Sequence, residues 1–157
     1  MKPRAFVEEI VRDLPAGRAL DLACGSGNNA VWLADRGWRV TAVDRAPAIE
    51  DPRIEVHTAD LEKHEYTIAP GAWDLIVMSY YLQRDLFPVV WQGLAPGGVA
   101  IIIVHMFEPG HEQSRFSLHA GELRAAFPEA EVIAYREGRN SPESRAVAQI
   151  AFRRHPR

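Results

Sequence analysis

The stretch Asp21-Leu22-Ala23-Cys24-Gly25-Ser26-Gly27-Asn28-Asn29-Ala30 decides the fold that we predict for this chain. A short apolar run over 19–23, broken only by Asp21, predicts a buried strand. Apolar residues at helical spacing over 28–36 predict a helix that ends at Gly37. Gly25 and Gly27 let the backbone turn sharply between the two and let a ligand approach it closely. The stretch therefore predicts a strand, a glycine-rich binding turn and a helix.

The rest of the chain repeats this alternation. An opening helix is expected over 6–14, stopped by Pro15, and further helices over about 82–94 and 123–127. Pro96-Gly97-Gly98 predicts a turn. Further strands are expected over 38–43, 54–57, 73–79, 99–104, 131–135 and 146–152. Alternating strands and helices predict an α/β fold with a mostly parallel seven-stranded sheet and helices on both faces. The polar loop 136–144 is too short for a parallel crossover, so the last two strands are expected to form an antiparallel C-terminal hairpin.

Composition limits the classes of protein that need to be considered. A length of 157 residues predicts a single domain, 1–157, and 47% apolar with 25% charged residues is typical of globular proteins. The net charge of −3 argues against nucleic-acid binding. One cysteine excludes an internal disulfide and favours a reducing, cytoplasmic location. We expect no secretory signal and no membrane span, because the longest apolar run, Val99 to Val104, is too short.

Charge distinguishes between two ligands for the glycine turn. Asp44 ends the next predicted strand, nineteen residues after Gly25, which suits ribose hydroxyls. A dinucleotide also fits this pattern, since Ala30 can replace the third glycine, and it would place a pyrophosphate at the helix N-terminus. Asp21 would repel that pyrophosphate. S-adenosylmethionine has no phosphate and carries an ammonium and a sulfonium, so a carboxylate at position 21 favours it.

At this point the sequence resembles the class I S-adenosylmethionine-dependent methyltransferases. The motifs that carry the resemblance follow the family order, at Asp21–Gly27, Val43–Ala46, Thr58–Leu61, Trp73–Ser79 and Leu94–Gly98. Within the family, Tyr81–Arg84 and Phe116–Leu123 are similar to the small tellurite-resistance-type (TehB-like) branch. The resemblance implies a three-layer Rossmann-like fold and S-adenosyl-L-methionine as the cofactor. It implies cofactor contacts from Asp21, Ala23, Cys24, Gly25, Ser26, Gly27, Asn28, Asp44, Arg45, Asp60, Leu61 and Ser79.

The sequence also departs from the family pattern. Only nine residues, including Pro47 and Pro52, separate Asp44 from Ile54, so the usual helix there is expected to be short or absent. Residues 61–72 are likewise short for a full helix. The loop from His105 to Leu118 is the main segment left for a substrate. Little chain therefore remains to enclose an acceptor, which favours a small molecule, an open pocket or a second subunit such as a homodimer partner.

Candidate catalytic residues follow from the rule that open α/β sheets bind ligands at the carboxyl ends of their strands. The rule selects Tyr80, Tyr81, Arg84 and His105, and beside them Met106, Arg115 and Phe116. The alternative for each is structural: a tyrosine closing the core, an arginine starting a helix in solvent, a histidine buried at a strand end. Cys24 is expected to be a small loop residue rather than a nucleophile. No metal site is expected, because the spacing of Glu108, His111, Glu112 and His119 matches no strong ligand motif.

The expected function is transfer of a methyl group from S-adenosylmethionine to a small-molecule acceptor. Two alternatives remain open. A nicotinamide-dependent oxidoreductase is disfavoured by Asp21 and by the lack of a second domain. A non-catalytic cofactor-binding partner subunit is suggested by the short connections after the second and third strands.

Overall fold

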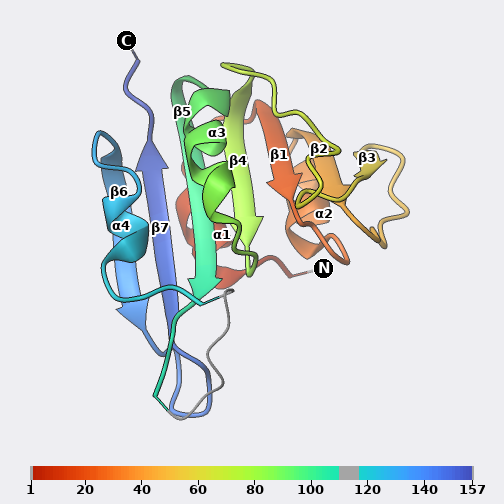
Figure 1. The fold of residues 1–157 in the computed structure, drawn as a ribbon. Coiled ribbons are helices and arrows are strands. Elements are labelled where there is room, and N and C mark those ends of the chain that lie inside the picture. Colours follow the sequence, from red (N-terminus) through yellow and green to blue (C-terminus); the bar gives the residue numbers. More distant parts are fainter. Residues whose placement is uncertain (1, 110–116, 157) are drawn as a thin grey trace.

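Seven strands form one sheet in the order β3-β2-β1-β4-β5-β7-β6 in the computed structural model, which describes residues 2–109 and 117–156 (Figure 1). The strands are β1 Arg18–Leu22, β2 Arg39–Asp44, β3 Glu55–Thr58, β4 Trp73–Ser79, β5 Leu94–His105, β6 Glu131–Gly138 and β7 Val147–Arg153. Strands β1 to β5 pair in parallel, and β7 is antiparallel to both β5 and β6. The predicted mostly parallel sheet with an antiparallel C-terminal hairpin is confirmed.

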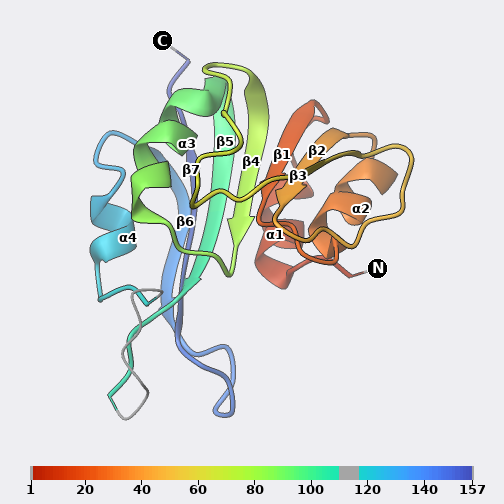
Figure 2. The ribbon, with the colours of Figure 1, turned by 45° about the vertical axis from the view of Figure 1, so that its right-hand side comes forward.

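Helices cover both faces of the sheet, which gives the expected three layers (Figure 2). Helices α1 Ala5–Val11 and α2 Asn28–Asp35 pack on one face. The short 3₁₀ helix η1 Arg84–Leu86, α3 Phe87–Gly93 and α4 Glu122–Ala125 pack on the other. Strand residues alternate between the faces: Leu20 and Leu22 contact the second group, and Ala19 contacts the first.

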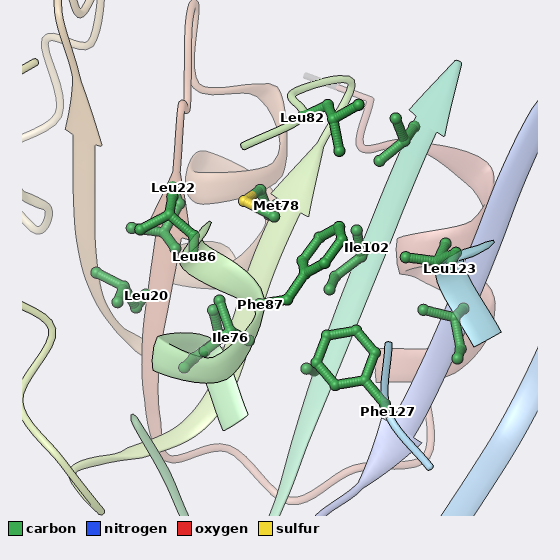
Figure 3. Packing of buried hydrophobic residues seen from close by; sticks show 14 of the residues in the cluster. Leu20, Leu22, Ile76, Met78, Leu82, Leu86, Phe87, Ile102, Leu123 and Phe127 are labelled. Atoms are coloured by element: carbon green, nitrogen blue, oxygen red, sulfur yellow. The ribbon is translucent and has the colours of Figure 1, made fainter. Parts of the chain in front are cut away.

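In the core beneath α3 and α4, phenylalanine rings pack among mostly aliphatic side chains, as Phe87 and Phe127 show in Figure 3. Phe87 of α3 lies 5.4 Å, centroid to centroid, from Phe127, and Phe127 lies 4.3 Å from Phe152 of β7. All three rings are at most 5% exposed. Burying such a ring contributes about 1.5–3 kcal/mol, so these contacts anchor the short α4 segment and the strand β7 to the sheet.

The structure differs from the prediction where the helix expected over 82–94 meets the turn expected at Pro96-Gly97-Gly98. The expected helix over 82–94 is divided into η1 and α3 and ends at Gly93, because Leu94 already pairs with Trp73 of β4. Pro96-Gly97-Gly98 is not a turn between elements but an irregular part of β5. There the residues 95–98 lie opposite Asp74 alone, since the next pair is Leu75 with Val99. Gly97 supplies a φ of +80°, and Gly98 allows backbone approach at a point where a Cβ atom would lie 2.7 Å from the Trp73 carbonyl oxygen.

Among the described residues, no helix follows the second or the third strand, in agreement with the prediction that the first of these helices is short or absent and that residues 61–72 are short for a full helix. Residues 45–54 and 59–72 contain turns and extended segments only. In Figure 1 the second of these segments crosses the face of the sheet that α3 and α4 leave bare near β1 and β2. None of the helices in the described residues is long and apolar enough to cross a membrane.

Candidate functional site

A cavity of about 420 Å³ opens where β1, β2 and β3 end. Its walls bring together five of the residues predicted to bind a cofactor, Ala23, Asp44, Arg45, Asp60 and Leu61. The remaining lining residues are Ala59, Glu62 and Tyr81. We call this the cofactor-side cavity. It lies at the carboxyl ends of parallel strands, as expected for an open α/β sheet.

The glycine turn borders this cavity in a left-handed backbone conformation. Ala23, Gly25 and Gly27 have φ angles of +57°, +55° and +84°. Gly27 has no room for a side chain, because a Cβ atom there would lie 2.4 Å from Cγ1 of Ile49. Ala23 adopts an angle that L residues with a Cβ atom rarely adopt. Such strain is typical of a backbone shaped to approach a ligand.

Asp44 holds the turn against the end of β2. Its Oδ1 accepts a hydrogen bond from the Gly25 N–H at 3.2 Å, and its Oδ2 accepts one from the Ala46 N–H at 2.9 Å. Each carboxylate oxygen has a further lone pair. Asp44 lines the cavity and can therefore hold the turn and accept hydrogen bonds from ligand hydroxyls at the same time.

Asp21 is the least satisfied polar group in the site. The residue is 1% exposed, and within the described residues neither carboxylate oxygen has a hydrogen-bond partner. Burial, together with the nearby charge of Asp44, raises the pKa of Asp21 from 3.8 to about 7. A buried carboxylate without a partner is costly, and a cation placed against it removes that cost. This environment suits a positively charged ligand group and is unfavourable for a phosphate.

The turn after β3 forms the opposite wall. Asp60 Oδ1 accepts from the Glu62 N–H at 3.0 Å, and the Ala59 N–H donates to the Asp44 carbonyl at 2.9 Å. The Leu61 carbonyl accepts from Gln83 Nε2 at 3.1 Å. Asp60 and Leu61, both predicted to contact the cofactor, thus lie in a turn that is fixed to the end of β2 and to Gln83, which follows β4.

A second, smaller cavity of about 150 Å³ lies at the ends of β4 and β5. We call it the acceptor-side cavity; it is lined by Tyr80, Tyr81, Leu82, Val104, His105, Ser117 and Arg145. Three of the four predicted catalytic candidates, Tyr80, Tyr81 and His105, meet here. The ring centroids of Tyr80 and His105 are 5.0 Å apart, and Tyr80 has a φ of +57°.

The acceptor-side cavity is positively charged. The Arg4 guanidinium lies 4.4 Å from the Tyr80 ring centroid, and Arg145 contributes a second cation. Among the described atoms, His105 Nδ1 and Arg145 Nε are buried without a hydrogen-bond partner. Burial, and then the charges of Arg145 and Arg4, lower the pKa of His105. These surroundings favour the neutral form of the His105 imidazole.

Other predicted residues have different positions. Arg84 binds Glu122 of α4 and donates to the Ser117 carbonyl, so it joins η1 to α4. Cys24 is half-buried, and burial raises the pKa of its thiol to about 12, which does not suit a nucleophile. Ser26 and Asn28 are exposed on the glycine turn, and Met106 is buried beside Leu118. Arg115, Phe116, His111 and Glu112 lie outside the described residues.

Ser79 belongs to a link that sequence reasoning missed. Its Oγ accepts from Asn29 Nδ2 at 3.1 Å, and Asn29 Oδ1 accepts from the Arg4 N–H at 2.8 Å. This link places the N-terminal segment beside the end of β4, as Figure 1 also shows. Arg4 and Arg145 lie in no motif, and Asn29 and Gln83, although they lie within Asp21–Ala30 and Tyr81–Arg84, were not predicted as site residues. Within the described residues, no group of three or more His, Cys, Asp or Glu side chains is arranged to hold a metal ion.

Comparison with known families gives a match over residues 2–151 to the family described as "Methyltransferase domain". The chain belongs to this family. Among curated relatives of this methyltransferase domain, a protein of Eikenella corrodens named hemagglutinin 1 is 28% identical over 148 residues, 83% of this chain and 49% of that protein. Trans-aconitate 2-methyltransferase of Streptomyces coelicolor is 34% identical over 137 residues, 73% of this chain and 45% of the enzyme. The chain spans about half the length of these curated relatives.

Solved structures show the same fold. TehB from Haemophilus influenzae superposes with a TM-score of 0.79 at 18% identity, over 97% of this methyltransferase domain and 62% of TehB. The Burkholderia thailandensis 1,6-didemethyltoxoflavin-N1-methyltransferase, which binds that compound and S-adenosylhomocysteine in its crystal structure, gives a TM-score of 0.72 at 15% identity. That match covers 97% of this chain and 77% of the enzyme. The predicted Rossmann-like methyltransferase fold is confirmed.

Proposed function

We propose that this chain binds S-adenosyl-L-methionine in the cofactor-side cavity and catalyses transfer of its methyl group to a small-molecule acceptor. The observation that carries the proposal is Asp21, a fully buried carboxylate without a partner in the described structure, beside a glycine turn of left-handed conformation. Family membership and the fold support the same reading. When bound, S-adenosylmethionine supplies a methyl group on a positively charged sulfur.

The residues present fit that cofactor. Asp21 provides negative charge for its cationic end, and the carboxylate of Asp44 accepts from the ribose hydroxyls. The side chain of Asp60 and the backbone of Leu61 hold the adenine. Ala23, the first residue of the glycine turn, and Arg45 line the same cavity. Ser79 keeps Asn29 and the N-terminal segment in place beside it.

The acceptor-side cavity favours a small anionic acceptor. Arg145 and Arg4 supply positive charge, and about 150 Å³ accommodates only a small group or molecule. His105, kept neutral by burial and by the two arginines, is the group placed to take a proton from an acceptor that arrives protonated. Tyr80 and Tyr81 form part of the wall of this cavity.

Calorimetric titration with S-adenosylhomocysteine tests the cofactor assignment. We expect saturable binding by the wild type and binding weakened about tenfold or more in Asp44→Ala, because hydrogen bonds to ribose are lost. Asp13→Asn, which alters an exposed aspartate in the turn after α1, is the matched control and should bind as the wild type does. A folded wild-type protein that does not bind S-adenosylhomocysteine would exclude the proposal.

The proposal that the acceptor is a small anion is tested by measuring methyl transfer from isotopically labelled S-adenosylmethionine to small anionic, neutral and cationic acceptors. Turnover confined to anions is expected, with kcat/KM lowered about tenfold in Arg145→Gln. Preference for cationic acceptors would contradict the assignment of the acceptor-side cavity.

A non-catalytic cofactor-binding subunit is the second candidate, suggested by the missing helices after β2 and β3. It predicts an exposed apolar contact surface, yet Ile133 is the one large apolar side chain that is exposed in the described residues. Cofactor binding without turnover of any acceptor would favour it. Enhanced NADH fluorescence on mixing would instead indicate an oxidoreductase.

The proposal includes one domain over 1–157, a cytoplasmic location and a homodimer. The single cysteine, half-buried in the glycine turn, supports a reducing compartment. Light scattering of the purified protein tests the homodimer, and a monomeric mass at working concentration would contradict it.

A further inference from the structure

Tyr81 is the side chain that the two cavities share. It lines the cofactor-side cavity together with Asp44 and Leu61, and it lines the acceptor-side cavity together with Tyr80 and His105. The position of this ring therefore sets the boundary between the two spaces. Any contact that fixes Tyr81 influences both.

The contact that fixes Tyr81 comes from Gln83. The Tyr81 hydroxyl donates a hydrogen bond to Gln83 Oε1 at 2.6 Å, and Gln83 Nε2 donates to the Leu61 carbonyl at 3.1 Å. Leu61 belongs to the cofactor-side wall, 22 residues away in the chain. The side-chain amide of Gln83 thus connects the turn after β3 to the ring that separates the cavities.

An amide suits this position better than other polar groups. Burial, with the charges of Glu62, Asp60 and Asp85, raises the pKa of Tyr81 to about 12, so the hydroxyl is a hydrogen-bond donor at neutral pH. It needs an acceptor, whereas the Leu61 carbonyl needs a donor. An amide offers both, but a carboxylate offers only acceptors and would repel the carbonyl oxygen.

We propose that Gln83 is a positioning residue that couples the cofactor-side cavity to the acceptor-side cavity. By binding the Leu61 carbonyl and the Tyr81 hydroxyl together, it makes ordering of the turn after β3 also order the acceptor-side wall. The inference rests on the proposed function, in which the cofactor occupies the space beside Leu61. It assigns Gln83 no contact with reacting atoms.

A double-mutant cycle on S-adenosylhomocysteine affinity tests this coupling. Gln83→Leu and Tyr81→Phe should each weaken binding about threefold to tenfold, the range expected for one hydrogen bond. The double variant should bind no more weakly than the weaker single variant, because each change breaks the same connection. Gln92→Leu, which alters an exposed glutamine of α3, is the matched control and should bind as the wild type does.

Hydrogen exchange separates coupling from a merely structural role. With saturating S-adenosylhomocysteine, wild-type amides over 60–66 and over 79–86 should both become protected. In Gln83→Leu, protection should be confined to 60–66. Thermal unfolding without ligand verifies that both single variants fold, and either one suffices for the exchange comparison.

The outcomes distinguish the two proposals. The coupling would be overturned if Gln83→Leu bound S-adenosylhomocysteine as tightly as the wild type does. It would also be overturned if the losses of affinity in the two single variants multiplied in the double variant. Either result would leave the proposed function intact. Protection of 79–86 that persists in Gln83→Leu would also overturn it. Failure of the wild type to bind S-adenosylhomocysteine would overturn the proposed function, and the coupling with it.

Discussion

The two cavities are built in different ways from the same sheet edge. Apart from Tyr81, which follows β4, the residues of the cofactor-side cavity come from the ends of β1, β2 and β3 and the turns directly after them, so they lie within short, continuous stretches. The acceptor-side cavity combines the end of β4, the end of β5 and Arg145, which precedes β7. Arg145 reaches this edge because β7 lies between β5 and β6, with Val147 paired to His105. One cavity depends on local turns, and the other depends on the topology of the hairpin.

The cavities also differ in charge. Three acids, Asp44, Asp60 and Glu62, line the first together with Arg45, and Asp21 is buried at the end of β1, whereas Arg145 lines the second and Arg4 lies over Tyr80. Under the proposed function, a cationic methyl donor and an anionic acceptor would each be attracted to a different side. This separation of charge would orient the two reactants toward one another before any chemistry occurs.

Removing the buried charge of Asp21 is expected to have the largest effect. The folded-state pKa, about 7, lies above the ordinary value of 3.8, so between these values the folded state keeps a proton that the unfolded state has lost. Stability of the ligand-free protein therefore falls as pH rises through this window. Between pH 5 and 8 the free energy of unfolding of the wild type should fall by roughly 3 kcal/mol relative to Asp21→Asn.

The same variant should lose cofactor. Loss of a charge-assisted contact is expected to weaken S-adenosylmethionine binding about 10- to 100-fold. Denaturant unfolding at several pH values and calorimetry measure the two effects, with Asp13→Asn as the control. If the free energy of unfolding changed with pH in the same way for Asp21→Asn and the wild type, Asp21 would ionise normally. That result would contradict the difference in charge between the two cavities.

Gly27→Ala is expected to have the next largest effect and tests the local turn. The substitution forces a residue with a Cβ atom to a φ of +84° and brings that atom against Ile49, so we expect a loss of about 1–3 kcal/mol in stability. Gly25→Ala is the matched control, since at φ +55° its Cβ atom meets nothing within 4 Å and only the backbone cost applies. Ile49→Ala should partly rescue Gly27→Ala but not Gly25→Ala. Equal losses in the two glycine variants would contradict the steric argument.

Because the cofactor-side cavity is built mainly from local turns, more of its residues could be predicted from the sequence. Asp44 and Asp60, which line the cofactor-side cavity, could be selected from the sequence because each lies at the end of a predicted strand or in the turn that follows it. The irregular path of β5 at 95–98 was not predictable, since it depends on pairing with β4.

The acceptor-side cavity was predicted only in part. Tyr80, Tyr81 and His105 follow from the rule of strand ends, but the guanidinium of Arg145 reaches them only through the position of β7 in the sheet. Arg84 follows the same strand, yet Glu122 of α4 engages it instead. Long-range pairing of this kind leaves no local pattern.

The electrostatics of the acceptor-side cavity give a smaller but more specific prediction. Arg145→Gln removes a cation that lowers the pKa of His105, so the pKa should rise toward the ordinary histidine value. Titration followed by the His105 ring resonances in NMR spectra measures it. Arg139→Gln, on the same hairpin but paired with Glu108, is the control. An unchanged His105 pKa in Arg145→Gln would show that the charge of Arg145 does not act on His105 in the acceptor-side cavity.

Arg4→Gln should have the smallest effect, in the same direction. Burial contributes most to the lowered pKa of His105, followed by Arg145 and then Arg4. Arg4 acts from the face of Tyr80 rather than as a lining residue, and its backbone N–H still donates to Asn29 after substitution. The N-terminal segment should thus keep its place while the charge disappears. A rise in the His105 pKa larger than that in Arg145→Gln would show that the N-terminal segment, and not the hairpin, controls the charge of the acceptor-side cavity.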